Sequence, residues 1–96
     1  MEDRTSALIQ YLMSSKNVLE AKATWGCGHC EVMFKVLPDE VTRHWLDGLR
    51  QRLGHLGFGD GGLLYRVGPI DFVLVGFGDP VLLVQQLESF PERMAG

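Results

Sequence analysis

The sequence predicts an α+β fold, a two-layer sandwich in which helices cover one face of a four-stranded, mostly antiparallel sheet. Three observations predict it. Two stretches of the chain alternate apolar and polar residues on both sides of a short turn, as the strands of a hairpin do. A segment with helical periodicity follows each hairpin, and a third such segment precedes the first hairpin. The expected order of elements is therefore α-ββα-ββα.

The first expected helix covers residues 3–15. Leu8, Tyr11 and Leu12 recur in it at the spacing of one helix face. We assign residues 1–17 to this N-terminal helix.

The first expected hairpin joins strands at residues 18–25 and 30–37 through a turn at Cys27-Gly28. Glycine in such a turn readily supplies the positive φ that the backbone needs. With this turn every apolar residue of one strand faces an apolar residue of the other, and a slip of one residue breaks all of the matches. The expected pairs are Trp25 with Cys30, Ala23 with Val32, Ala21 with Phe34, and Leu19 with Val36.

The second expected helix begins after Pro38, with Asp39 as its N-cap residue. Gly54 and Gly57 are suited to end it. Its buried stripe is expected to contain Val41, Trp45, Leu46, Leu49, Leu53 and Leu56.

A glycine-rich linker at residues 57–62 leads to the second expected hairpin, whose strands cover residues 63–67 and 70–77. With Gly68-Pro69 as the turn, Arg66 faces Asp71 as a favourable cross-strand charge pair. The apolar pairs expected on the other face are Val67 with Ile70, Tyr65 with Phe72, and Leu63 with Leu74.

The last expected helix begins at Asp79-Pro80, because aspartate is a preferred N-cap residue and proline suits the first helical position. Its apolar stripe contains Leu83, Val84, Leu87 and Phe90.

The two hairpin–helix units, residues 18–56 and 63–93, align with an offset of about 40 residues, as an internal repeat does. Two such units side by side are similar to a permuted ferredoxin-like arrangement. A chain of 96 residues has room for one domain, so we expect residues 1–96 to form a single domain.

A second set of apolar residues is expected on the sheet face that points away from the helices of the two units. A sheet face left to water is normally polar, so we expect this face to be covered and to form an interface. The N-terminal helix and a second copy of the chain are both candidates for the cover. The residues of this expected interface are Met33, Leu37, Val73, Val75 and Phe77.

The composition argues against several classes of function. The chain is 46% hydrophobic and has a formal net charge of −3 without a basic cluster, whereas nucleic-acid binding needs a positive footprint. It has neither an apolar run long enough to span a bilayer nor a basic amphipathic helix, so we expect no membrane partner. The acidic N-terminal residues differ from a signal peptide, and two cysteines cannot build a disulfide framework, so we expect a cytoplasmic protein.

One short motif suggests chemistry. Trp25 and the tetrapeptide Cys27-Gly28-His29-Cys30 resemble the active-site motif of the thioredoxin and protein disulfide isomerase family. In that family the motif follows a strand and opens a helix, whose dipole lowers the pKa of the first cysteine. Here an alternating strand pattern and then Pro38 follow the motif, so the resemblance covers these residues and does not extend to the fold.

Three interpretations of the cysteine pair are open. Cys27 is a turn residue and Cys30 a small buried apolar residue, or the two form a redox-active dithiol beside His29. In the third interpretation they bind zinc, which needs four ligands. Because His44 and His55 lie too far apart along one helix to share an ion, two copies of the chain meeting at their turns would have to supply four cysteines.

We therefore expect a non-enzymatic interaction or regulatory module that acts as a homodimer through the face bearing Met33, Val73 and Val75. We expect no catalytic residue, because no serine stands in a nucleophile-elbow pattern and no pair of carboxylates converges. We expect no cofactor, and zinc is considered only for the alternative function that follows. The alternative is a thiol-redox or zinc-binding protein that uses the Cys27-Gly28-His29-Cys30 turn.

Overall fold

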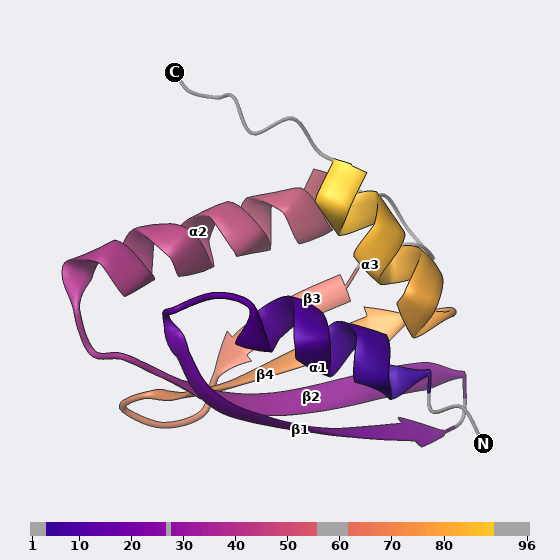
Figure 1. Ribbon diagram of the computed structural model, residues 1–96, viewed down its shortest axis with the longest axis horizontal. Coiled ribbons are helices and arrows are strands. Elements are labelled where there is room, and N and C mark those ends of the chain that lie inside the picture. The colour runs from indigo at the N-terminus through magenta and orange to yellow at the C-terminus, as the bar shows by residue number, and fades with distance from the viewer. Residues whose placement is uncertain (1–3, 27, 56–61, 90–96) are drawn as a thin grey trace.

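The computed structural model describes residues 4–26, 28–55 and 62–89, and in them three helices and four strands follow the predicted order (Figure 1). No helix among these residues is long and apolar enough to cross a membrane. The elements are α1 (Thr5–Met13), β1 (Val18–Gly26), β2 (His29–Val36), α2 (Glu40–His55), β3 (Gly62–Arg66), β4 (Asp71–Phe77) and α3 (Pro80–Ser89).

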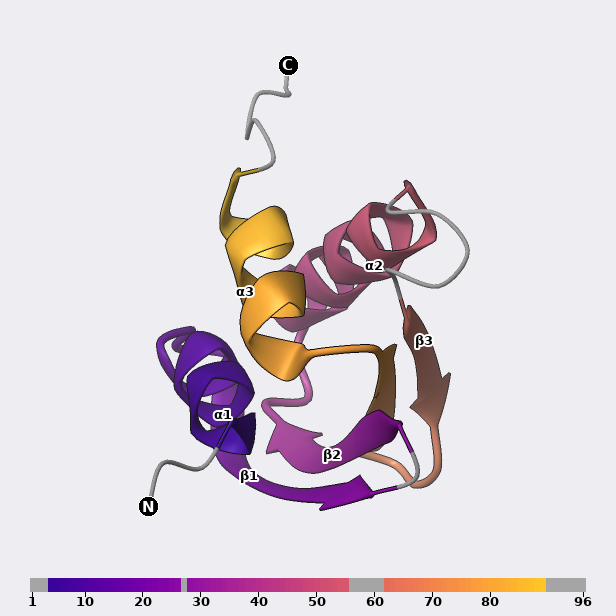
Figure 2. The same ribbon diagram turned by 90° about the vertical axis from the view of Figure 1, so that its right-hand side faces the viewer.

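The four strands form one sheet in the order β1-β2-β4-β3, and every neighbouring pair is antiparallel. The predicted α+β class and the four-stranded sheet are confirmed. Figure 2 shows the sheet curving around the helices, all of which lie on its inner side. α1 packs against β1 and α3 in this helix layer. The N-terminal helix was one candidate for covering the other sheet face, and it does not cover it. We call that uncovered side the open face.

The core lies between the helix layer and the inner face of the sheet. Phe34 is at its centre, stacked on Phe72 with 6.0 Å between ring centroids and edge-on to Trp45 at 6.5 Å. Burying large apolar side chains between two layers is the main favourable term in folding a small domain. The other buried members of the core are Leu8, Leu12, Val18, Cys30, Val32, Val36, Leu46, Leu49, Leu53, Leu64, Leu74, Leu83, Val84 and Leu87.

The first hairpin has the predicted register over most of its length. Trp25 pairs with Cys30, Ala23 with Val32 and Ala21 with Phe34, and Gly28 has a φ of 81° at the turn. The predicted pairing of Leu19 with Val36 is wrong. A β-bulge at Leu19 brings Val18 opposite Val36 instead, which buries Val18 and leaves Leu19 half exposed.

The second hairpin is shifted by one residue from the predicted register. Its loop spans residues 68–70, because the Val67 and Gly68 N–H groups both donate to the Asp71 carbonyl, at 2.8 and 3.2 Å. Proline at the second position of a two-residue turn is unfavourable, and the longer loop avoids it. The shift reverses the faces of β3. The observed pairs are Leu63 with Val75, Leu64 with Leu74, Tyr65 with Val73, and Arg66 with Phe72.

The predicted pairing of Arg66 with Asp71 is wrong for the same reason. Asp71 instead faces Lys35 across β2 and β4, and the Lys35 Nζ lies 2.7 Å from its Oδ1. Arg66 moves to the inner face of the sheet, where its Nε donates to the Gly68 carbonyl at 2.9 Å.

The first helix is shorter than the expected residues 3–15, because α1 begins at Thr5 and ends at Met13. The second and third helices begin where the sequence predicts. The Asp39 carboxylate accepts the Thr42 N–H at 2.8 Å, and the Asp79 carboxylate accepts the Val81 N–H at 2.9 Å. The buried stripe of α2 differs at its start: Thr42 is 1% exposed and Val41 is 68% exposed. Thr42 tolerates burial because its hydroxyl donates to the Asn17 Oδ1 at 3.1 Å.

Some predictions fall on residues outside the described part of the chain. They include Leu56 and Phe90 in the helix stripes and residues 57–61 of the expected linker. The last linker position, Gly62, is the first residue of β3.

Gly76 tests the packing of β4 beneath α3. A Cβ atom added there meets the Leu83 Cδ2 at 2.7 Å and the Cys30 Sγ at 3.1 Å. We expect Gly76→Ala to lower the free energy of unfolding by about 1–3 kcal/mol, the usual range for overpacking a core. Urea denaturation followed by circular dichroism measures this.

The matched control is Gly26→Ala in β1, where an added Cβ meets nothing within 4 Å. We expect the control to stay within about 0.5 kcal/mol of wild type. Equal stability of the two variants would contradict the close packing at Gly76.

Candidate functional site

Gly28, His29 and Cys30 of the cysteine motif lie at the end of the first hairpin where β2 begins. Gly26 pairs with His29, and β2 continues directly from His29. A strand therefore follows the motif, where the thioredoxin family has a helix. Cys27 lies outside the described residues.

Cys30 is fully buried in the core as a free thiol. Its Sγ lies 3.7 Å from the Gly76 carbonyl oxygen, to which the thiol donates. Burial raises the pKa of Cys30, with hydrogen bonds to backbone groups acting in the opposite direction. Because the thiolate is the nucleophile and the metal ligand, these surroundings favour Cys30 as a buried apolar residue.

In the described part of the chain, no three His, Cys, Asp or Glu side chains lie close enough together to hold a metal ion. These residues therefore do not supply a ligand set for zinc. His29 is partly exposed at the start of β2. A site shared by the turns of two chains would involve Cys27, and it stays a prediction.

The open face carries a contiguous apolar patch. In one row across the strands Met33, Val73 and Tyr65 are neighbours, and in the next row Val75 and Leu63 are. Met33 is 56%, Leu63 48% and Tyr65 45% exposed. We define the apolar patch as Met33, Leu63, Tyr65, Val73, Val75 and Phe77, of which Val75 is buried.

The β1 side of the open face is charged. Lys35 pairs with Asp71 at 2.7 Å, while Glu31 and Lys22 make no ion pair within the described residues. Side chains of both signs therefore border the apolar patch. They are Glu20, Lys22, Glu31, Lys35 and Asp71.

One residue of the expected interface lies elsewhere. Leu37 follows the end of β2 and lines a groove beside α2. Leu63 and Tyr65, which were expected among the pairs of the helix-covered face, join the open face because the second hairpin is shifted by one residue.

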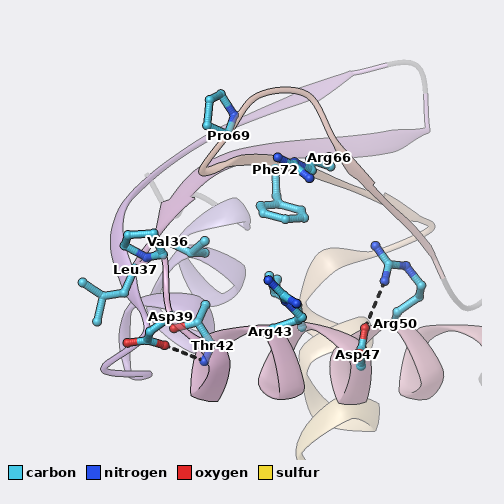
Figure 3. A pocket seen from close by; sticks show the side chains of 12 residues that line it. Val36, Leu37, Asp39, Thr42, Arg43, Asp47, Arg50, Arg66, Pro69 and Phe72 are labelled. Atoms are coloured by element: carbon cyan, nitrogen blue, oxygen red, sulfur yellow. Dashed lines mark hydrogen bonds and ion pairs between the residues drawn. The ribbon is translucent and has the colours of Figure 1, made fainter.

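The groove beside Leu37 lies between the first half of α2 and the loop that joins β3 to β4. It has a volume of about 360 Å³. Figure 3 shows Arg43 and Arg50 rising from α2 and Arg66 at the level of the hairpin, with the Phe72 ring between Arg43 and Arg66. Val36 and Leu46 complete the apolar floor beneath these cations.

The sequence reasoning did not find this groove. Arg43 and Arg50 are seven residues apart, which places both on one side of a helix after two turns. That spacing is a local signal for a basic stripe. Arg66 was expected on the opposite sheet face, so its approach to α2 depends on the register shift of the second hairpin.

Comparison with known proteins finds no family model, curated protein or solved structure that matches this chain.

The burial of Cys30 predicts an unreactive thiol. In the Cys27→Ser variant, where only Cys30 can react, we expect dithionitrobenzoate to label the folded protein at least about a hundredfold more slowly than the urea-unfolded chain, because the core must open first. Absorbance of the released thiolate measures the rate. Rapid stoichiometric labelling of the folded variant would contradict this assignment and favour the redox interpretation.

The Asp39 cap predicts a pH-dependent contribution to stability. Hydrogen bonds from Thr42 lower the pKa of Asp39, so its stabilising effect is present above the ordinary aspartate pKa and is lost as pH falls through the lower, folded-state pKa. We expect Asp39→Ala to melt at a lower temperature than wild type at neutral pH, and the difference to shrink in acid. Thermal unfolding across pH measures it, with Asp47→Ala, on the same helix, as the control that shows a smaller change.

Proposed function

We propose that this protein is a non-enzymatic interaction module of the cytoplasm that acts as a homodimer joined through the open face. The observation that carries the proposal is the apolar patch, which the helices leave uncovered. Contiguous apolar surface of this kind is typical of protein–protein interfaces. The cytoplasmic part is supported by Cys30, which is a free, buried thiol.

The patch lies on the convex side of the curved sheet, where a second sheet can make a face-to-face contact with it. Met33, Val73 and Tyr65 lie side by side on neighbouring strands, and sheets that pack face to face interdigitate such side chains about 10 Å apart. Removing the exposed parts of Met33, Leu63 and Tyr65 from water stabilises the contact in proportion to the apolar area buried.

The charges along β2 favour a second copy of the chain as the partner. The open-face side chains of β2 are His29, Glu31, Met33 and Lys35, and Glu31 and Lys35 place opposite charges on the two sides of the methionine. A two-fold axis that crosses the strands at Met33 brings each Glu31 opposite the partner's Lys35. An isologous interface requires this kind of self-complementarity.

The cysteine turn is the alternative basis for a function. The burial of Cys30 does not favour a thiol or zinc function, and Cys27 lies outside the described residues. The redox and zinc interpretations stay predictions that thiol labelling and metal analysis of the purified protein test.

We expect the wild-type protein to have the mass of two chains in size-exclusion chromatography with light scattering. Met33→Asp places a charge at the centre of the apolar patch and should weaken the dimer by about 2 kcal/mol or more, as loss of a central interface residue does. Met33 is 56% exposed in the single chain, so the variant should keep its fold, which circular dichroism checks.

The matched control is Leu82→Asp, which charges an exposed leucine on α3, away from the open face. It should remain dimeric. Glu31→Lys should weaken the dimer more at low salt than at high salt, because it places two like charges together across the two-fold axis. A wild-type protein that stays monomeric at high concentration, or equal dissociation of both aspartate variants, would contradict the proposal.

A further inference from the structure

We propose that the groove between α2 and the β3–β4 hairpin binds a small organic anion, with Arg43 and Arg66 supplying the positive charge that attracts its carboxylate or phosphate group and with its apolar part lying against Phe72. This site is on the helix side of the sheet, so it is independent of the dimer proposed through the open face.

The size and floor of the groove suit a small ligand. Its volume of about 360 Å³ lies within the usual range for small-molecule sites, roughly 300–1,000 Å³. The floor is made by Val36, Leu46 and the Phe72 ring, all of which are buried or nearly so. An aromatic or aliphatic group that enters the groove therefore meets apolar atoms.

Two guanidinium groups at this groove have unused donors. The Arg43 side chain makes no hydrogen bond or ion pair with the described residues, although it points from α2 towards the Phe72 ring in Figure 3. Arg66 uses only its Nε, which donates to the Gly68 carbonyl, so its Nη atoms are free to donate. Planar guanidinium groups bind carboxylate and phosphate through paired hydrogen bonds.

The acidic residues of the groove neutralise only part of its positive charge. The Asp39 carboxylate accepts the Thr42 N–H as a helix cap. Asp47 lies 3.5 Å from Arg50 and forms an ion pair with it. The three arginines and two aspartates that line the groove leave one positive charge in excess, in a chain whose formal net charge is −3.

This charge pattern selects a small anion over a polymer. Binding of nucleic acid depends on many phosphate contacts along a basic surface, and here the excess positive charge is confined to one groove. A single carboxylate or phosphate group matches the two free guanidinium groups. The neighbouring Phe72 ring adds a preference for a ligand that also has an apolar part.

The proposal is tested with two probes, phenyl phosphate and phenylacetate, titrated into the ¹⁵N-labelled full-length protein. We expect both to shift the amide signals of Thr42, Arg43, Arg66 and Phe72. Benzyl alcohol lacks the charge and inorganic phosphate lacks the ring, and each should bind at least about tenfold more weakly, the change expected from losing one charged hydrogen-bonding group or the apolar contact.

Arg43→Gln and Arg66→Gln should each weaken binding of the anionic probes at least about tenfold. The control Lys22→Gln removes a positive charge from the open face and should bind as wild type does. Circular dichroism confirms that all three variants are folded. The proposal is overturned if neither probe shifts these signals, if benzyl alcohol binds equally well, or if neither arginine variant weakens binding.

Discussion

The burial of Phe34 between the sheet and α2 is the constraint on which the rest of the structure depends. Its ring stacks on Phe72 of β4 and meets the edge of Trp45 of α2, so a single side chain joins both central strands to the helix layer. Because side chains alternate across a strand, fixing Phe34 inward directs Met33 and Lys35 outward. The composition of the open face is thus set by the same contact that organises the core.

Local patterns were sufficient to predict the element order and most of the first hairpin. The turn at Gly28 matched apolar side chains on both strands, and only the β-bulge at Leu19 departs from that match. In the second hairpin two registers satisfy the apolar pattern nearly equally well, because residues 63, 64 and 65 are all apolar or aromatic. Because Pro69 is unfavourable at the second position of a two-residue turn, it favours the register with the longer loop. The pattern of apolar residues alone does not distinguish the two registers.

The sequence predicts those parts of the candidate sites whose side-chain direction follows from alternation along a single strand. The open-face positions of Met33, Val73 and Phe77 follow from alternation, whereas Leu63 and Tyr65 reach that face only through the shifted register. The arginine-lined groove brings together side chains from α2 and from a hairpin that follows it in the chain. The groove therefore depends on tertiary structure, and the pattern of residues within any one segment predicts neither the charge of the groove nor its apolar floor.

The β-bulge at Leu19 also makes the outer strand β1 a less regular template for a strand of another molecule. β1 is an outer strand of the sheet and is nine residues long, a length at which a regular edge would offer its free backbone groups to a strand of another molecule. The extra residue disrupts the spacing of those groups near one end of the strand, and Glu20 and Lys22 add charge beside it. The addition of further strands at this edge of the sheet is thereby disfavoured.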